Sequence, residues 1–449
     1  MERQIGLLKS SPQTRSGQAG FKRPFRTLPN ASKPLSLRAY LAASRAIPLL
    51  APMLLRRRLA KGKEDPDRWQ EKQGLASLDR PKGRLIWLHA VGLGEVLALR
   101  GLIAALSRRD PQLSFLITST ARSSAQVVGT NLPPRTQHQF LPLDAPSYLA
   151  QFLDHWQPDL SIWAEQDIWP GAVVATNARA IPIALINARL SGDGFARRAR
   201  LRGLYRAVMR RLSFVSAQDG HSATRLADLG AQNVQITGSL KPAAPLLNTV
   251  ESECTRLRSL LADRRIWVAA STHPGDEAEA IKAQATKPGW LLILVPRDVG
   301  RADNVANALN TAGISFAQRS LKQLPGPEHA VWLADSYGEL GLWYRLAEVA
   351  LIGGGFDQIG GHNPWEAAAL GAAILHGPDV ANFVADYAAL DGAGAAKQLA
   401  PGALAAALND ADLAGMAGMA DKASALIAEK RDALDQLSAD LLALIERPA

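Results

Sequence analysis

The stretch RLIWLHAVGLGEVLALRGLIAAL, residues 84 to 106, contains in one run the parts from which a parallel α/β domain is built. RLIWLHA has the composition of a buried strand, Gly92 and Gly94 allow a tight turn, and the remainder has the spacing of a helix. A parallel sheet is covered by helices on both faces, so apolar runs that alternate with helical stretches indicate a doubly wound sheet.

This alternation occurs twice along the chain. The first series has predicted strands ending at Ala90, Ser119, Leu143, Ala164, Asn187, Ala217 and Thr237, and the second has strands ending at Ala270, Val295, Ala317, Ala334, Gly353 and His376. KPAAPLLNTV, residues 241 to 250, has two prolines and no strand pattern, which favours an interdomain linker. We therefore predict an α/β fold with two Rossmann-like domains facing a cleft, at residues 61–245 and 246–449. Helical spacing from about Asp412 to Ile445 predicts closing helices for the second domain.

Composition supports this organisation. A chain of 449 residues suggests two or three domains, and 47% hydrophobic with 20% charged residues is typical of a soluble globular protein. Cys254 is the single cysteine, which excludes an intramolecular disulfide framework and a cysteine-based zinc cluster and fits a reducing cytoplasm.

Residues 1–60 form a basic segment ahead of the first domain and contribute much of the net charge of +10. Few aromatic residues accompany these charges, so we predict no nucleic-acid partner and favour an anionic membrane surface. Residues 35–55 are apolar, but Arg38, Arg45, Pro48 and Pro52 interrupt them, which indicates an anchor that lies in the interface or inserts marginally. A basic amphipathic helix packed on its own protein is the alternative.

Carboxylates follow two predicted strands of the first domain. Glu95 stands near the start of a helix, where a general base could face a cleft and where the helix dipole alone also favours an acid. A dinucleotide site is disfavoured, because GLGEVL lacks the third glycine and no acidic residue ends the second strand. Glu165 and Asp167 lie together in AEQDIWPG, and two carboxylates this close rarely serve packing alone. From the residues alone, a functional pair and structural ion pairing with cations both stay open.

The second domain has a stronger signal in GGGFDQIGGHNPWEAAALG, residues 353 to 371. A strand there ends in glycines, and Pro364 begins a helix with Glu366 in its first turn. Free backbone amides can bind a phosphate and an acid can accept hydrogen bonds from ribose hydroxyls, so this segment predicts a nucleotide site. No metal-ligand spacing occurs in the sequence, and we predict neither a metal nor a cofactor.

From about Arg84 to Ala396 the sequence resembles the 3-deoxy-D-manno-octulosonic acid (Kdo) transferases, glycosyltransferases of GT-B fold. The resemblance is carried, in order, by HAVGLGE, PLD, AEQDIWP, INARLS, TGSLK, ASTHPGDE, LVPRD, GELGLWY, GGHNPWE and HGPDVANF. It implies inverting transfer of Kdo from CMP-Kdo, a substrate, to a lipid A precursor of the lipid IVA type in lipopolysaccharide core synthesis. It also implies a location at the cytoplasmic face of the inner membrane.

The resemblance assigns roles residue by residue. Glu95 matches the family's proton acceptor, and Glu165 and Lys241 match its transition-state stabilisers. The implied contacts to CMP are Pro296, Arg297, Tyr337, Gly338, Glu339, Asn363, Pro364, Trp365 and Glu366. The sequence departs from the family at Gly92 (for serine), in EQDIWPG with its Asp167 (for ETELWPN), and at Asp298 (for histidine).

Other functions share these features. A GT-B enzyme that uses a different nucleotide sugar, an epimerase on the same frame, or a non-catalytic nucleotide-sugar binding protein would each need the two domains. The second carboxylate motif departs from the family pattern, but Glu95, Glu165 and Lys241 occur together, which favours an enzyme.

Overall fold

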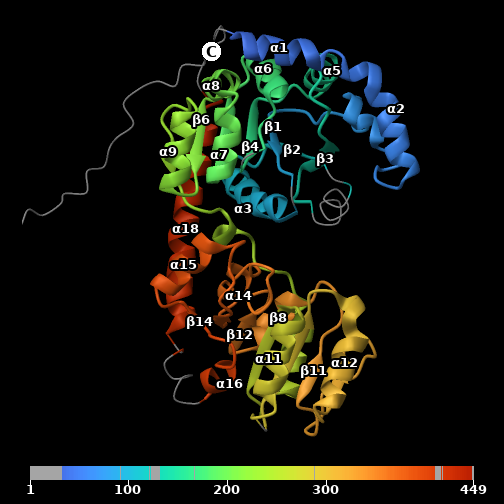
Figure 1. Ribbon diagram of the computed structural model, residues 1–449, viewed down its shortest axis with the longest axis vertical. Helices are drawn as coiled ribbons and strands as arrows, with labels where there is room; N and C mark the ends of the chain where they lie inside the picture. Colours follow the sequence, from blue (N-terminus) through green and yellow to red (C-terminus); the bar gives the residue numbers. More distant parts are fainter. Residues whose placement is uncertain are drawn as a thin grey trace, which may run out of the picture.

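The computed structural model describes residues 33–91, 93–120, 122, 132–165, 167–287, 289–409, 416 and 418–446, with the side chains of 93–98 outside the description. These residues form two parallel sheets of seven strands each, one per domain (Figure 1). The α/β doubly wound fold predicted from the sequence is confirmed.

The first sheet consists of β1 (Leu85–His89), β2 (Ser114–Ser119), β3 (Thr136–Phe140), β4 (Leu160–Ala164), β5 (Ile183–Ala188), β6 (Phe214–Ala217) and β7 (Gln235–Ile236). The second consists of β8 (Ile266–Thr272), β9 (Leu291–Pro296), β10 (Phe316–Gln318), β11 (Val331–Leu333), β12 (Val349–Ile352), β13 (Ala373–His376) and β14 (Ala396–Gln398).

The helices of the first part of the chain are α1 (Leu35–Ser44), α2 (Ile47–Ala60), η1 (Trp69–Gln73), α3 (Leu93–Arg109), α5 (Pro146–Trp156), α6 (Pro170–Ala178), α7 (Gly192–Ala199), α8 (Arg202–Met209), α9 (Gly220–Asp228) and η2 (Lys241–Ala243). The second part has α10 (Glu251–Leu260), α11 (Pro274–Gln284), η3 (Val299–Arg301), α12 (Ala302–Thr311), α13 (Leu340–Leu346), α14 (Trp365–Ala368), α15 (Val384–Gly392), α16 (Leu404–Ala407) and α18 (Met419–Leu442).

Strand order determines where each sheet can bind a ligand. The first sheet runs β3-β2-β1-β4-β5-β6-β7 and the second runs β10-β11-β9-β8-β12-β13-β14. In each sheet the chain first forms the strands on one side of its first strand and then crosses to the other side. Ligands of open parallel sheets bind at the carboxyl end of such a switch point. The two switch points are therefore β1/β4 and β8/β12.

Apart from shifts of one or two residues at strand ends, two details of the strands differ from the sequence prediction. HQFLPL was expected to end a strand at Leu143, but β3 ends at Phe140, because the following residues turn toward α5. The sequence also predicted no strand at Ala396–Gln398, where β14 pairs with β13 at the sheet edge. This strand has three residues, two of them polar, so it has no apolar run to reveal it.

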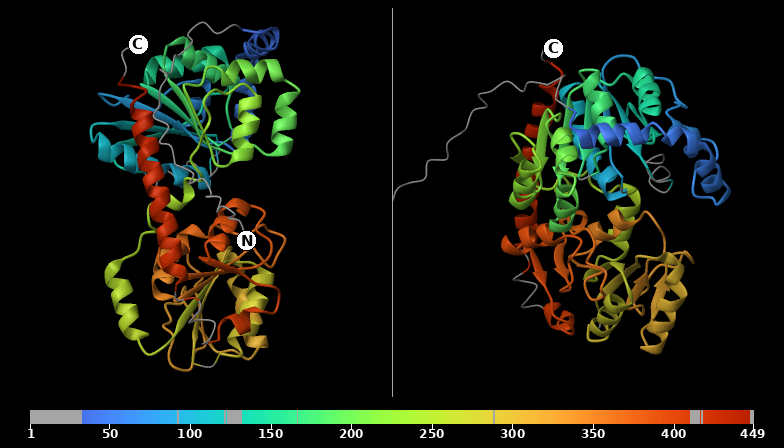
Figure 2. Two further views of the ribbon diagram at one scale, coloured as in Figure 1. Left: turned by 90° about the vertical axis from the view of Figure 1, so that its left-hand side faces the viewer. Right: turned by 45° about the horizontal axis from the view of Figure 1, so that its top comes forward.

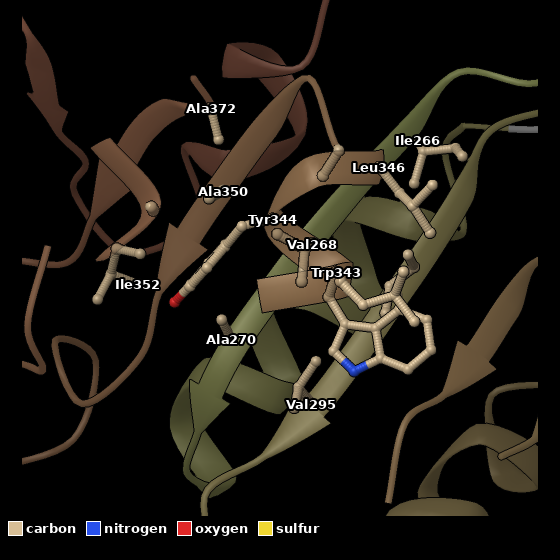
Figure 3. Packing of buried hydrophobic residues seen from close by; sticks show 14 of the residues in the cluster. Ile266, Val268, Ala270, Val295, Trp343, Tyr344, Leu346, Ala350, Ile352 and Ala372 are labelled. Atoms are coloured by element: carbon tan, nitrogen blue, oxygen red, sulfur yellow. The ribbon is translucent and has the colours of Figure 1, made fainter. Parts of the chain in front are cut away.

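Each sheet is packed on both faces, as its apolar strands require. In the second domain Trp343 and Tyr344 of α13 are buried against the β8 residues Val268 and Ala270 (Figure 3). Packing of large aromatic side chains against small ones on the strands fixes α13, and with it the GELGLWY segment, over the sheet.

The long helix α18, expected to close the second domain, packs on both domains (Figure 2). Its Ala423 and Ile427 belong to the core of the second sheet, whereas Leu434 and Leu437 belong to the core of the first. The Arg108 guanidinium of α3 also donates to Asp435 of α18 at 2.7 Å. One rigid element therefore connects the two domains and constrains how their carboxyl edges face each other.

The helices α1 and α2 lie on the first domain (Figure 1). In α1 Leu37 is fully buried beside Val174 and Leu204, and the Tyr40 hydroxyl donates to Asp144 at 2.6 Å. In α2 Ala51 and Leu55 are buried, and its neighbouring apolar residues are exposed: Leu49, Leu50, Met53 and Leu54. The segment therefore combines packing on its own protein with an apolar outer face. Among the described residues, no helix has the length and apolarity needed to cross a membrane.

Asp144 of the PLD motif has a structural role. Its carboxylate accepts the backbone N–H groups of Gly171 and Ala172, at 2.8 and 2.7 Å, in the first turn of α6. A Cβ at Gly171 would lie 2.6 Å from that carboxylate, so the close approach requires glycine. Asp144 thereby joins α6 and, through Tyr40, α1 to the sheet.

Acid should destabilise the fold through His138. The Arg68 guanidinium approaches Nδ1 at 3.2 Å and the ring Nε2 lies 2.9 Å from the Ser119 hydroxyl. Burial and, secondarily, the charge of Arg68 lower the His138 pKa to about 3. Below a pH of about 6.5 this histidine is protonated in the unfolded chain but stays neutral in the folded chain. The free energy of unfolding should therefore fall by up to about 1.4 kcal/mol per pH unit as the pH drops toward 3.

Chemical denaturation of wild type and His138→Gln between pH 7 and pH 4 measures this contribution. The substitution should reduce the pH dependence of stability, whereas His221→Gln, at an exposed position in α9, should leave it unchanged. Equal pH dependence in wild type and His138→Gln would contradict the assignment.

Candidate functional site

The two predicted carboxylate loops of the first domain follow the strands of its switch point. Glu95 lies in the first turn of α3, directly after β1, and its side chain is outside the described residues. Glu165 follows β4, and its N–H donates to the Ile186 carbonyl at 3.0 Å. The backbone of Glu165 has φ of +60°, a left-handed conformation that is costly for a residue with a Cβ and is common at functional sites. Topology thus brings the Glu95 and Glu165 loops to one edge.

Asp167 pairs with a buried histidine. Its Oδ2 lies 3.6 Å from Nε2 of His89, which is fully buried at the end of β1, and accepts the Trp169 indole N–H at 3.2 Å. Burial opposes ionisation, but His89 and Trp169 outweigh it and lower the Asp167 pKa. The aspartate that replaces the family's second glutamate is therefore held as a carboxylate beside the Glu95 loop.

Lys241 faces the second domain from the end of the first. The Asn187 side chain, just within β5, accepts the Leu240 N–H at 3.1 Å and so fixes the backbone before η2. The Lys241 Nζ lies 4.2 Å from the Phe383 ring centroid and 4.0 Å from Asp386 Oδ2. An ammonium in contact with a ring and a carboxylate of the other domain is well placed to meet a bound anion.

A cavity of about 170 Å³ joins these groups across the two domains. Its lining includes Lys241 and Arg100 from the first domain and Asn363, Trp365 and Glu366 from the second. The structure therefore brings together residues predicted from two separate motifs, Lys241 of TGSLK and three residues of GGHNPWE. Asp386 links them further, because it accepts the Trp365 indole N–H at 2.8 Å while lying near Lys241.

The GGHNPWE segment turns into α14 as predicted. The Asn363 side-chain oxygen accepts the Trp365 N–H and its amide donates to Glu366, each at 3.2 Å, and Pro364 caps the helix. Burial raises the pKa of Glu366, against the opposing effects of Asn363 and Arg297. Hydrogen bonds donated by ribose hydroxyls would stabilise such a carboxylate. The helix has four residues, so its dipole contributes little to anion binding.

Glycines close this loop tightly on β8. A Cβ at Gly353 would lie 2.3 Å from the Ser271 carbonyl oxygen, so the first of the three glycines cannot be replaced without moving the backbone. Asp276 of α11 accepts the N–H groups of Gly354 and Phe356, at 2.6 and 3.1 Å. The loop after β12 is thus fixed against the start of α11, at the switch point of the second sheet.

Two histidines meet at this switch point. Nε2 of His273, which precedes α11, lies 2.9 Å from Nε2 of His362, and the rings stack 13° from parallel. Burial, His273 and Arg297 lower the His362 pKa to about 4. His362 is therefore neutral at pH 7, and one Nε2–H must be donated across the pair. The sequence analysis did not single out either histidine. His273 lies in STHPGDE and His362 lies in GGHNPWE, two motifs that follow strands.

The remaining predicted donor-site residues lie around the same edge. The Arg297 N–H donates to the Thr272 carbonyl at 3.0 Å, which places the residue after Pro296 beside the end of β8. Asp298, where the family has histidine, caps η3 through the Gly300 N–H at 2.9 Å. It therefore has a local structural function.

The residues of the GELGLWY segment differ in how available they are to a ligand. Tyr337 is 70% exposed, and Gly338 has φ of +86°, which turns the chain into α13. Glu339 is held by the Arg319 guanidinium at 2.7 Å and by the Ser336 hydroxyl, which lower its pKa against the effect of burial. Its carboxylate already has strong partners, and contacts of this segment to CMP stay a prediction. No three His, Cys, Asp or Glu side chains within the described ranges form a group that could hold a metal ion.

The chain is similar to known proteins of one family. The family described as 3-Deoxy-D-manno-octulosonic-acid transferase (kdotransferase) matches residues 67–244. A 3-deoxy-D-manno-octulosonic acid transferase of Rickettsia bellii is 32% identical, covering 72% of this chain and 78% of that protein. One of Haemophilus influenzae is 34% identical, covering 69% and 74%. A glycosyltransferase structure from Rickettsia africae aligns with a TM-score of 0.52 at 11% identity, covering 82% of this chain and all of that one.

Two parallel sheets of seven strands with a cavity between their domains define a protein of GT-B fold. Within that class, identity above 30% over more than two thirds of its relatives shows that the chain belongs to the Kdo transferase family.

Proposed function

We propose that this enzyme transfers Kdo from CMP-Kdo to a hydroxyl of a lipid A precursor of the lipid IVA type, with inversion at the anomeric carbon. The observation that carries the proposal is the interdomain cavity, where Lys241 faces Asn363, Trp365 and Glu366. The nucleotide would lie on the second domain, and the acceptor would approach from the edge that bears the Glu95 and Glu165 loops.

The reaction is a single displacement. The acceptor oxygen forms a bond to the anomeric carbon of Kdo as the bond to the phosphate oxygen breaks, and the electron pair of that bond leaves with CMP. Glu95 takes the acceptor proton. Lys241 and Arg297 supply positive charge for the phosphate, and Glu165 stabilises the transition state. Glu366 accepts hydrogen bonds from the ribose.

The proposal includes a place of action at the cytoplasmic face of the inner membrane. Leu49, Leu50, Met53 and Leu54 are exposed on α2, and after the buried Leu55 come Arg56, Arg57 and Arg58. An apolar face bordered by cations suits an anionic lipid surface. The lipid acceptor could then enter the active site while its acyl chains stay in the bilayer.

Purified protein incubated with CMP-Kdo and a tetra-acylated lipid A precursor tests the proposal by mass spectrometry. A product heavier by one or more Kdo residues is expected. Binding of UDP in preference to CMP would favour another nucleotide sugar, and CMP-Kdo binding without turnover would favour a non-catalytic binding protein.

Activity should survive chelation. CMP has one phosphate, and Lys241 and Arg297 can balance its charge, so no divalent ion is required for its departure. Turnover in EDTA should equal turnover in buffer with magnesium. Loss in EDTA with restoration by magnesium would contradict this account of the leaving group.

A further inference from the structure

A second cavity, of about 780 Å³, lies between α2 and the carboxyl edge of the first sheet. One wall is Ala43, Ile47, Leu50 and Leu54, and the facing wall includes Leu143 and Trp169. Its volume falls within the range of about 300 to 1,000 Å³ typical of small-ligand sites. The nucleotide site described above does not use it.

One end of this cavity is polar. Asp167 and Thr120 line it, beside the edge where the Glu95 loop leaves β1. His89 is fully buried behind Asp167, and its Nε2 lies 3.6 Å from the Asp167 carboxylate. The polar end therefore offers a polar group of a ligand the Asp167 carboxylate, which is held in place by His89.

The mouth of the cavity is apolar and then basic. Leu50 and Leu54 are 58% and 49% exposed, so the cavity is continuous with the outer face of α2. Arg56, Arg57 and Lys61 are exposed just beyond it. Arg58 and Lys72, also in the lining, pair at 2.5 Å with the buried carboxylate of Glu64, which fixes this wall. The order along the surface is polar edge, apolar chamber and cationic rim.

We propose that this cavity holds one acyl chain of the lipid acceptor. An amphiphile with an apolar chain and an anionic head matches the apolar chamber and the cationic rim in charge and polarity. The chain would lie against Leu50 and Leu54, and its sugar would reach the edge that bears Asp167. The identity of the amphiphile rests on the proposed transferase function, whereas the apolar site itself can be tested without transfer.

Neighbouring alanines on α1 provide a matched pair of variants. Ala42 and Ala43 are both exposed, but only Ala43 lines the cavity. Ala43→Trp should fill the chamber, and Ala42→Trp should add the same apolar side chain outside it. The probe is dodecyl phosphate, titrated below its micelle concentration by calorimetry, with butyl phosphate as the head-group control.

Wild type and Ala42→Trp should bind dodecyl phosphate with similar affinity and butyl phosphate much more weakly. Ala43→Trp should weaken dodecyl phosphate binding by at least about tenfold, since excluding two methylenes from an apolar site is enough for that factor. In the transfer assay it should raise KM for the tetra-acylated acceptor and leave turnover of a deacylated acceptor unchanged.

Equal binding by Ala43→Trp and wild type would overturn the acyl site while leaving Kdo transfer intact. Similar affinity of the wild type for butyl and dodecyl phosphate would show that only the phosphate is bound, and would also overturn the acyl site. A wild-type dimer that Ala43→Trp dissociates in sedimentation would assign the chamber to a second copy of the chain. If Ala43→Trp weakened dodecyl phosphate binding but the wild type transferred no Kdo, the apolar site would stand and the proposed reaction would be wrong.

Discussion

Replacement of Glu95 by glutamine should lower the single-turnover rate by about 100- to 10,000-fold, the usual range for loss of a general base. Glutamine retains the size and hydrogen-bonding capacity of the side chain and removes the proton acceptor. CMP affinity should be unchanged, because the predicted nucleotide contacts lie on the other domain. Rapid-quench kinetics and CMP calorimetry on one preparation measure both quantities.

Glu251→Gln is the matched control, because Glu251 is an exposed acid in the first turn of α10. It should change neither the rate nor CMP affinity. If Glu95→Gln turned over at a near-normal rate, Glu95 would be removed from the mechanism and Glu165 would become the next candidate. A lower melting temperature with a normal rate would indicate a structural helix-start residue.

Replacement of Lys241 by methionine should lower the transfer rate by about 100- to 1,000-fold, as expected when one preorganised charge is withdrawn from a transition state. The methionine preserves the length of the side chain beside Phe383, so packing there should be retained. Lys241→Arg should recover part of the rate by restoring the cation. Single-turnover measurements at saturating CMP-Kdo report the effect.

Lys282→Met serves as the control, because Lys282 is exposed near the end of α11. A Lys241→Met enzyme with the control's rate would show that the ammonium is only a structural partner of Asp386. Weaker CMP-Kdo binding with an unchanged rate at saturation would limit Lys241 to ground-state binding.

The fold was predictable because parallel strands are buried on both faces, so LIWLH and LLILV stand out as apolar runs. Edge strands lack this signal, which is why β14, with two polar residues in three, was missed. The helical spacing of α18 was visible, but its two packing partners were not, since periodicity identifies an apolar face and not what covers it.

Motif order predicted the members of the site better than their contacts. Lys241 and Glu366 are far apart in sequence and line one cavity because α18 and the linker hold the two domains together. Interactions between loops of different strands gave no sequence signal. The His273–His362 contact and the pairing of Asp167 with His89 arise from strand order, which a single sequence does not state.

The cavity beside α2 also could not be predicted from the sequence. The apolar stretch at residues 35–55 indicated an interfacial anchor, and the alternative was a helix packed on its own protein. The segment contains both buried and exposed apolar residues, because Leu37 and Ala51 face inward while Leu49 and Met53 face outward. Packing on its own protein is observed, and the anchor stays a prediction. Hydropathy alone cannot tell which apolar residues of such a segment are buried and which are exposed.

Mass spectrometry of a reaction containing purified enzyme, CMP-Kdo and a tetra-acylated lipid A precursor is the most direct test of the central claim that the interdomain cleft transfers Kdo. The expected result is an acceptor heavier by whole Kdo residues, with release of CMP, and loss of this product in both Glu95→Gln and Lys241→Met. An unmodified acceptor with wild-type enzyme, or equal product from wild type and both variants, would contradict it.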